Sequence, residues 1–416
     1  MNSGFPATDV RPTNFQVLSY RDSLLALKLS VLEIFLIFLK LGISSFGGPI
    51  AHLGYFRREF VEKRKWLDGH AYADLVSLCQ FLPGPASSQV GMALGLARGG
   101  FMGAILAWIG FTLPSALLLV IFGLEFHYFQ GSFGNWLHGL KIVSVAVVAQ
   151  AIWVMSKSQL SDWHQVALTV VSAGIAISSP APMTQMLIIA AGGLYGLLFM
   201  NAPNALPREP MRNIPGRKAG LALLSTFFFL LGLLPVVATG SGSHAVRLFD
   251  SFYRAGALVF GGGHVVLPLL QSQVVPNGWV SNSEFLAGYG AAQAVPGPLF
   301  TFAAFLGAVS SGTPSGWTGA AIALCAIFLP SFLLITGILP FWEDLRRIAS
   351  VERAMKGINS AVLGLLIAAF WNPVCMTAIR NEFDIAIAFV SFLLLLKLPS
   401  WSVVASTVLI AGIVHP

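Results

Sequence analysis

The sequence predicts an all-α polytopic membrane protein built from two inverted-topology repeats with broken or re-entrant helices. Three observations lead to this prediction: an apolar composition, a succession of membrane-length segments, and an internal repeat whose loop charges change sides. Of the 416 residues, 56% are hydrophobic and only 10% are charged, against roughly 25% charged in a typical soluble domain. Mean hydropathy is +0.77. Because a backbone inside lipid must satisfy its own hydrogen bonds, the spanning segments are expected to be helices.

Apolar segments of about the 20 residues that cross a bilayer follow one another from Leu24 to the end of the chain. Uninterrupted segments are expected at 99–125, 138–156, 164–180, 183–200, 219–240, 316–340, 357–371, 382–397 and 400–415. Further segments contain Gly and Pro breaks, at 24–50, 70–97, 248–270 and 285–310. Residues 1–23 hold charges without an apolar core, so we expect a cytoplasmic N-terminal segment and no cleavable signal peptide.

Two parts of the chain resemble each other at a nearly constant offset. SFGGPIAHLG at 45–54 is matched by VFGGGHVVLP at 259–268, and QFLPGP at 80–85 is matched by QAVPGP at 293–298. Further aligned pairs are Lys40 with Arg254, Trp66 with Trp279, Pro114 with Pro330 and Gly139 with Gly357. We therefore expect a first repeat over 24–200, a linker with one extra transmembrane helix over 201–240, and a second repeat over 241–416.

Loop charges predict that the two copies are inverted. The loop 57–65 is strongly basic, whereas its counterpart 271–283 has no charge; 342–356 is basic, whereas its counterpart 127–139 has no Lys or Arg. Since basic loops stay in the cytoplasm, equivalent loops lie on opposite sides. The linker holds Arg208, Arg212, Arg217 and Lys218, which predicts a cytoplasmic N-terminus and a periplasmic C-terminus.

The broken segments allow two arrangements with the same ends. Either every apolar segment crosses the membrane, or the four broken segments enter and leave on one side. The second arrangement is preferred because it places every basic loop in the cytoplasm.

The breaks predict a binding site near the membrane midplane, where inverted repeats of secondary transporters hold their substrates. PGP cannot continue a helix, because proline removes backbone donors and glycine permits a sharp turn. The residues that follow each PGP begin new helices, whose unpaired N–H groups and partial positive charge suit an anion. The FGG phrases supply a second break in each half.

Lys40 and Arg254 precede the FGG phrases at equivalent positions. A cation in the middle of a span costs roughly 2.5–3.5 kcal/mol, so it usually has a function or a partner. Two cations, four helix ends and nearby hydroxyls together describe a site for a tetrahedral oxyanion. The predicted substrate-binding residues are Lys40, Ser44, Ser45, Gly47, Gly48, Gln80, Pro83, Gly84, Pro85, Ser87, Ser88, Arg254, Gly261, Gly262, Gln293, Pro296, Gly297, Pro298 and Thr301.

Each of these residues also has a plainer interpretation. Lys40 and Arg254 could extend to the membrane interface, and the amides of Gln80 and Gln293 could cap broken helix ends. Glu33 and His264 are candidates for proton coupling. Glu33, two helical turns before Lys40, could equally well neutralise it.

The FGGP phrase, the loop RREFVEKRKWL and the run LCQFLPGPASSQVGMALGLARGGFMGAILAWIGFTLPS strongly resemble the chromate ion transporter family in its long-chain, two-domain bacterial form. The resemblance covers most of the chain. It implies chromate export from a bacterial cytoplasm across the inner membrane, chromate resistance, and energy from the proton-motive force, with sulfate as a related oxyanion. In the second half Gly263 replaces the proline of FGGP.

Other classes of function fit less well. The sequence has no nucleotide-binding loop, no clustered metal ligands and no nucleophile with a base in sequence context, so neither an enzyme nor an ATP-driven pump is expected. Cys79, Cys325 and Cys375 are interpreted as packing residues. A sulfate or other oxyanion carrier and an anion channel remain as alternatives. The expected partners are a small oxyanion, protons and lipid, without a cofactor, metal or nucleic acid; a homodimer remains open.

Overall fold

The computed structural model describes residues 20–126, 134–179, 181–201, 215–260, 263–345 and 348–414. Within these ranges the chain forms helices and no strand. Helices long and apolar enough to cross a membrane are Ala86–Leu124, Gly134–Gln159, Arg217–Gly240, Gly316–Phe341 and Ala349–Ala378. The prediction of an all-α protein that crosses a membrane several times is confirmed. The predicted site residues Gly261 and Gly262 lie outside the described residues, as do 202–214 of the predicted linker.

The first half contains short helices around the predicted breaks and longer ones after them. Its elements are α1 (Tyr20–Ser44), α2 (Gly48–Phe56), the π-helix η1 (Arg57–Lys63), α3 (Gly69–Phe81), α4 (Ala86–Leu124), α6 (Gly134–Gln159), α7 (Trp163–Ser178) and α8 (Pro182–Phe199). Helix α9 (Arg217–Gly240) follows the linker.

The second half likewise has short elements around its predicted breaks and longer helices after them. Its elements are α10 (His244–Ala257), η2 (Gly263–Val265), α11 (Val266–Val274), α12 (Asn282–Ala294), η3 (Leu299–Thr301), α13 (Phe302–Val309), α14 (Gly316–Ile338), η4 (Leu339–Phe341), α15 (Trp342–Leu345), α16 (Ala349–Ala369), η5 (Phe370–Cys375), α17 (Met376–Ala378), α18 (Glu382–Leu395) and α19 (Ser400–Val414). Helix α16 begins eight residues before the expected apolar segment at 357, because its polar first turns continue the helix beyond the apolar stretch.

Capping residues explain where several of these helices begin. The Asp68 side chain accepts hydrogen bonds from two backbone N–H groups at the start of α3. Asp162 before α7 and Ser281 before α12 each form a capping box with the residue three positions later. Such side chains satisfy N–H groups that the helix itself leaves unpaired.

Helix α4 reverses direction within its length. Gly99 and Gly100 leave the helical conformation, with φ of −133° and 61°. On either side of this turn, Gly95 and Gly103 meet backbone to backbone. Gly307 and Gly319 meet in the same way where α13 turns into α14. The broken segments 70–97 and 285–310 therefore end in hairpins rather than running straight into the next span.

The two halves are interlocked. Helix α16 of the second half packs against α7 and α8 of the first, whereas α6 of the first half packs against α18 and α19 of the second. Gly357 lies against Gly192 in one of these contacts, and the aligned Gly139 lies against Val408 in the other. Neither half thus has a complete set of packing partners of its own.

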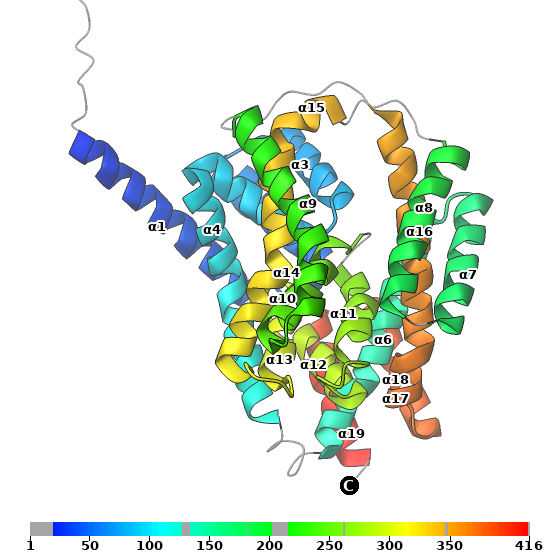
Figure 1. Cartoon of the computed structure of the whole chain (residues 1–416). Helices are drawn as coiled ribbons and strands as arrows, with labels where there is room; N and C mark the ends of the chain where they lie inside the picture. Colours follow the sequence, from blue (N-terminus) through cyan, green and yellow to red (C-terminus); the bar gives the residue numbers. More distant parts are fainter. Residues whose placement is uncertain are drawn as a thin grey trace, which may run out of the picture.

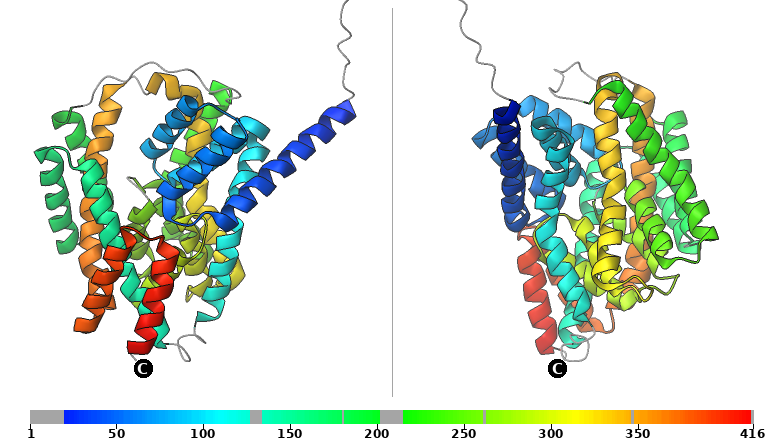
Figure 2. Two further views of the ribbon diagram at one scale, coloured as in Figure 1. Left: turned by 180° about the vertical axis from the view of Figure 1, so that it is seen from behind. Right: turned by 60° about the vertical axis from the view of Figure 1, so that its left-hand side comes forward.

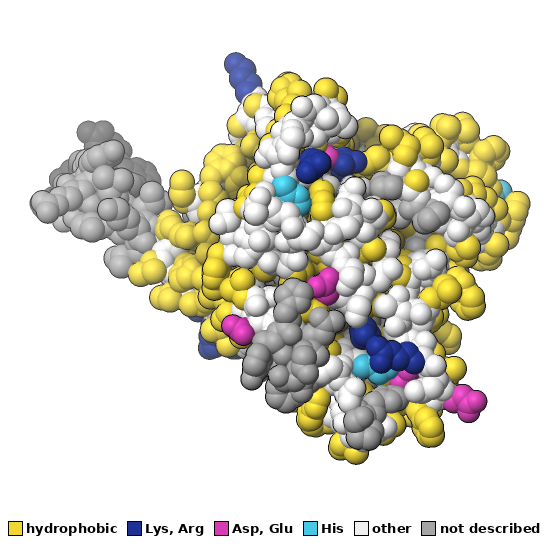
Figure 3. All heavy atoms as spheres, turned by 60° about the horizontal axis from the view of Figure 1, so that its bottom comes forward, with side chains coloured by type: hydrophobic (Ala, Val, Ile, Leu, Met, Phe, Trp, Pro, Cys, Tyr) yellow, Lys and Arg dark blue, Asp and Glu magenta, His cyan; other side chains and the backbone are white. Residues whose placement is uncertain are grey.

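Helices α3 and α15 lie at one end of the molecule, and the end of α19 lies at the opposite end (Figures 1 and 2). Large hydrophobic side chains such as Phe228, Phe229 and Val236 of α9 are exposed. Figure 3 shows the end near α19, with many hydrophobic side chains around its rim and only a few scattered charges. A hydrophobic outer surface of this kind fits a surrounding bilayer.

Candidate functional site

The two PGP turns are tied to opposite halves by a reciprocal pair of hydrogen bonds. The Gly84 N–H donates to the Val259 carbonyl at 2.7 Å, and the Gly297 N–H donates to the Ser45 carbonyl at 3.0 Å. Gly84 aligns with Gly297 and Ser45 with Val259, so the same contact is made twice. We call the turns 83–85 and 296–298, together with residues 45–49, 259–260 and 263, the crossing.

Both PGP glycines hold conformations that other residues rarely adopt. The φ angle is 121° at Gly84 and 100° at Gly297, where a side chain is strained. A methyl group on Gly84 would collide with Ser331 Oγ and approach Gln89 Nε2 to 2.8 Å; one on Gly297 would lie 2.7 Å from Ser115 Oγ. Since Ser331 and Ser115 follow the aligned prolines of α14 and α4, this contact is also made twice.

Pro49 and Gly263, the residues that follow the two FGG phrases, lie beside each other in the crossing. A methyl group on Gly263 would lie 3.3 Å from Pro49 Cγ and 3.8 Å from Leu299 Cδ2. Pro49 and Gly263 occupy the same position in the two aligned phrases. The beginnings of α2, η2 and η3 are therefore neighbours, and the hydrogen bond at Gly84 brings the beginning of α4 to the same region.

These helix beginnings lack side-chain caps. Gly47 precedes α2, Pro85 precedes α4 and Pro298 precedes η3, and none of them bonds the first N–H groups through a side chain. Uncapped N–H groups at a helix start attract anions through hydrogen bonding and the helix dipole. Three uncapped beginnings thus come together at the crossing.

Buried polar side chains around the crossing add donors that have no protein partner among the described residues. Such atoms are Ser45 Oγ, Ser88 Oγ, Thr112 Oγ1, Ser331 Oγ and Gln293 Nε2. Buried donors normally find a partner, and those that do not call for an explanation such as a bound ion or water. Hydroxyl and amide donors are the groups that bind an oxyanion.

Several predicted residues already have partners within the crossing. The Ser87 hydroxyl lies 3.4 Å from His52 Nδ1, and His52 Nε2 lies 3.2 Å from the Ser45 carbonyl. The Thr301 hydroxyl donates to the Pro298 carbonyl at 2.7 Å. These contacts stabilise the breaks.

The two predicted cations lie in different environments. Lys40 is exposed on α1, and its ammonium makes no hydrogen bond or ion pair with another described residue; its carbonyl accepts from the Ser44 hydroxyl at 2.8 Å. Arg254 on α10 pairs with Asp250, with Nε to Oδ1 at 3.0 Å and Nη2 to Oδ2 at 2.5 Å. No described contact joins Lys40 to Arg254. Gln80, at the end of α3, is exposed as well.

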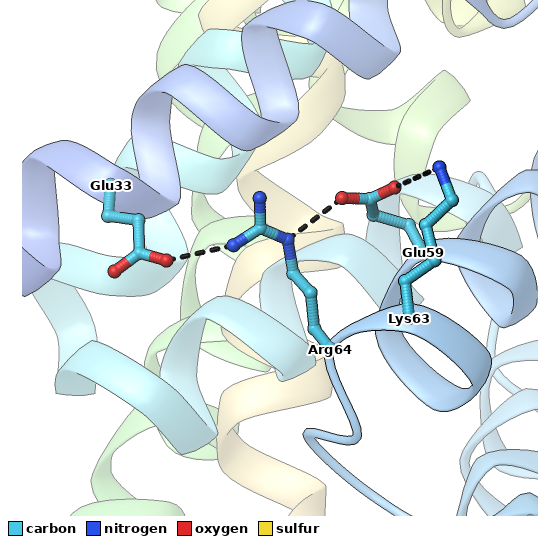
Figure 4. A network of polar contacts seen from close by, with 4 residues as sticks. All are labelled: Glu33, Glu59, Lys63 and Arg64. Atoms are coloured by element: carbon cyan, nitrogen blue, oxygen red, sulfur yellow. Dashed lines mark hydrogen bonds and ion pairs between the residues drawn. The ribbon is translucent and has the colours of Figure 1, made fainter.

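Glu33 contacts a residue of the basic loop rather than Lys40. Arg64 Nη1 donates to Glu33 Oε1 at 2.8 Å, and Arg64 Nε donates to Glu59 Oε1 at 2.8 Å. Lys63 completes this network, in which Arg64 points between the two carboxylates (Figure 4). The second proton-coupling candidate, His264, lies with Nδ1 2.8 Å from the Tyr289 hydroxyl.

Three residues at or near the crossing were missed by sequence reasoning. His52 is buried between Ser45 and Ser87, but its aligned partner is Val266, so a search for repeated residues passes over it. Gln89 is fully buried and donates to the Pro83 carbonyl at 2.7 Å. Asp250 could have been found, because a carboxylate four residues before an arginine on a helix is a common ion pair.

Two cavities lie away from the crossing. One, of about 550 Å³, is apolar and lies between α6 and α18. The other, of about 630 Å³, is lined by the end of α4 and by residues around Trp279 and Glu284. Among the described residues no group of three or more His, Cys, Asp or Glu side chains could hold a metal ion. The crossing therefore remains the candidate site.

Comparison with known proteins places the chain in a family. A sequence profile described as "Chromate transporter" matches residues 32–197 and 246–415. The chain is 29% identical over 358 residues to a chromate transport protein of Pseudomonas aeruginosa, covering 84% of this chain and 82% of that protein. It is 28% identical over 402 residues to a chromate transport protein of Cupriavidus metallidurans, covering 92% and 93%.

A probable chromate transport protein of Synechococcus elongatus is 28% identical over 338 residues, covering 80% of this chain and 81% of that protein. No solved structure matches the chain. Because the profile covers well over half of the chain, this multi-pass membrane protein belongs to the chromate transporter family.

Proposed function

We propose that this protein is a secondary active transporter that exports chromate from the cytoplasm, is driven by the proton-motive force and confers chromate resistance. Membership of the chromate transporter family supports chromate as the substrate. The observation on which the site rests is the reciprocal bonding of Gly84 to Val259 and of Gly297 to Ser45. These bonds bring uncapped helix beginnings from both halves together, and such an arrangement favours a small dianion.

The proposal includes a membrane orientation. The basic helix η1 adjoins α3 in the chain, and the basic stretch 342–356 includes α15; α3 and α15 lie at the same end of the molecule (Figure 1). Placing this end in the cytoplasm follows the excess of Lys and Arg in cytoplasmic loops. The C-terminus would then be periplasmic, in the inner membrane of a bacterium. A phosphatase fused after residue 416 should be active; a fluorescent protein that folds only in the cytoplasm should stay dark there.

The two cations are proposed to attract the substrate. Lys40 carries a charge that no described residue neutralises, and Arg254 presents a fork that binds planar or tetrahedral oxyanions through two parallel bonds. A hydrogen bond to a charged group contributes about 1.5–3 kcal/mol, which corresponds to roughly 10- to 100-fold in affinity. Removing either cation should weaken chromate binding by that amount.

Inside-out membrane vesicles provide the test, because export in the cell becomes uptake into the vesicle. Chromate uptake is measured with and without a proton gradient, for the wild type and for Lys40→Ala, Arg254→Ala and Lys40→Arg. The exposed Lys397→Ala serves as the charge-matched control. We expect wild-type uptake to require the proton gradient, and we expect uptake to fall in Lys40→Ala and in Arg254→Ala. Normal uptake in both of these variants would refute the site. Inhibition by excess sulfate tells whether the site accepts other tetrahedral dianions, and uptake that never exceeds equilibrium would indicate a channel.

A further inference from the structure

We propose that Asp250 is an internal competitor that occupies Arg254 in the empty transporter and thereby selects dianions over monovalent anions. This inference rests on the proposed function, because it assigns Arg254 to the oxyanion site. It goes further by giving a role to a carboxylate that repels the substrate and would have no place in a simple anion site.

The Asp250 carboxylate binds Arg254 as an oxyanion would. Its two oxygens accept from Nε and Nη2 of one guanidinium edge, at 3.0 Å and 2.5 Å. This two-pronged geometry is the one by which arginine also binds phosphate-like anions. An incoming oxyanion that needs the same edge must displace the carboxylate.

The pair is shielded from solvent. The Asp250 side chain is 4% exposed and that of Arg254 is 19% exposed. Gln273 of α11 contacts the same Nη2 at 3.4 Å, so the pair also connects α10 to the helix that follows the FGG break. A buried pair is opened only when another charge replaces the lost partner, since an unpaired buried charge is unfavourable.

The pair lies one helical turn from the crossing. The Arg254 carbonyl accepts from the Leu258 N–H at 3.1 Å, and the next residue, Val259, accepts the hydrogen bond from Gly84. If an arriving anion displaces Arg254, the movement would therefore be transmitted through Val259 to the turn at Gly84, which joins the two halves.

Few other charges compete for this pair. Helices α9, α11 and α14 pack against α10. Their only Lys, Arg, Asp or Glu residues are Arg217 and Lys218, at the beginning of α9, and α14 also contains the thiol of Cys325. On α10 itself, His244 precedes Asp250 by six residues and Arg247 precedes it by three.

The first repeat lacks this carboxylate. The residue that aligns with Asp250 is Leu36, which is 52% exposed, and it lies four residues before Lys40. One of the two aligned cations thus has an internal counter-ion, and the other has none among the described residues. An arriving anion must replace a buried carboxylate at Arg254, and a dianion attracts the guanidinium about twice as strongly as a monovalent anion does. A monovalent anion carries no more charge than the carboxylate and therefore gains little by displacing it.

The test measures anion selectivity in the purified full-length protein in detergent. Radiolabelled sulfate is the probe, because it remains a dianion near neutral pH, and nitrate is the monovalent competitor. In the wild type, nitrate should displace sulfate poorly. In Asp250→Asn, sulfate should bind about ten-fold more tightly and nitrate should compete about ten-fold better relative to sulfate. The exposed Asp344→Asn, which removes one carboxylate elsewhere, should behave as the wild type.

The outcomes separate this inference from the proposed function. A wild-type protein that binds neither sulfate nor chromate would refute the proposed function. If Arg254→Ala abolishes sulfate binding while Asp250→Asn keeps the wild-type nitrate-to-sulfate ratio, the competitor role alone is refuted. A purely structural ion pair would change thermal stability and leave that ratio unchanged.

A second variant decides the matter if Asp250→Asn does not fold. Leu36→Asp places a carboxylate one turn before Lys40, in the arrangement found at Asp250 and Arg254, at an exposed position. It should weaken sulfate binding about ten-fold by competing for Lys40, whereas Leu36→Asn should not. Unchanged affinity in Leu36→Asp, where Lys40→Ala itself weakens binding, would contradict the mechanism.

Discussion

Replacing Gly84 by alanine should damage the crossing more than any ordinary glycine substitution. Three effects add at this position. The φ angle of 121° strains a side chain by about 1–2 kcal/mol. The new methyl group collides with Ser331 Oγ and crowds Gln89 Nε2. Relief of that collision would stretch the hydrogen bond to the Val259 carbonyl, which contributes about 0.5–1.5 kcal/mol. A total loss of about 2–4 kcal/mol of unfolding free energy is expected.

The measurement is denaturant unfolding of the full chain in detergent micelles, with chromate uptake measured in parallel. Gly174→Ala is the control, since Gly174 lies inside α7 with no atom within 4 Å of the new methyl group. That substitution should be neutral or stabilising, because alanine favours helices by up to about 1 kcal/mol over glycine.

A double-mutant cycle makes the reasoning specific. Ser331→Ala removes the colliding oxygen, which has no described partner, and should restore part of the stability of Gly84→Ala. Ser115→Ala alters the aligned serine, which contacts Gly297 instead, and should give no rescue. Equal rescue by both serine variants, or a Gly84→Ala protein as stable as Gly174→Ala, would refute the argument.

Three further substitutions test contacts outside the crossing. Asp384→Ala removes the carboxylate that lies 3.1 Å from His138 Nε2 in a buried pair, and it should lower the unfolding free energy by about 3–5 kcal/mol. The exposed Asp344→Ala should lower it by less than about 1 kcal/mol. Similar unfolding midpoints for the two variants would contradict this. Burial raises the pKa of Glu59, but hydrogen bonds from Arg64 and Lys63 outweigh it and hold that pKa below 4.5. The stability from this lowered pKa is fully present above pH 4.5 and is lost as the pH falls through the lowered pKa. Glu59→Gln should therefore have a lower melting temperature than the wild type at neutral pH and a similar one at acidic pH. Thermal melts of both proteins at the two pH values check this. Ser281→Ala removes a capping box and should lower stability by about 1 kcal/mol, an effect absent if α12 is held by packing alone.

Much of the architecture was predictable because its signals are local. Helix breaks at FGG and PGP follow from the conformational limits of glycine and proline, and the structure has a helix end at each of them among the described residues. The alignment of the two halves picked out Gly84 with Gly297, and both prove to make the same kind of contact. Inverted topology, re-entrant segments and the substrate contacts remain predictions.

The environment of each charge was not predictable in the same way. Sequence reasoning treated Lys40 and Arg254 as equivalent and linked Glu33 to Lys40. In the structure Arg254 pairs with Asp250, Glu33 pairs with Arg64, and Lys40 is exposed. Glu33 and Arg64 are separated by the FGG break and by helices α2 and η1, so only the folded chain brings them together.

The sequence by itself determined that this protein lies in a membrane, that its helices break at repeated positions, and that it belongs to the chromate transporter family. These properties depend on composition, on spacing and on the allowed conformations of single residues. The tertiary structure alone decided that each half anchors the broken helix of the other and that one of the two aligned cations has a buried counter-ion. Such pairings depend on which surfaces pack together, and packing between distant segments has no periodic signal along the chain.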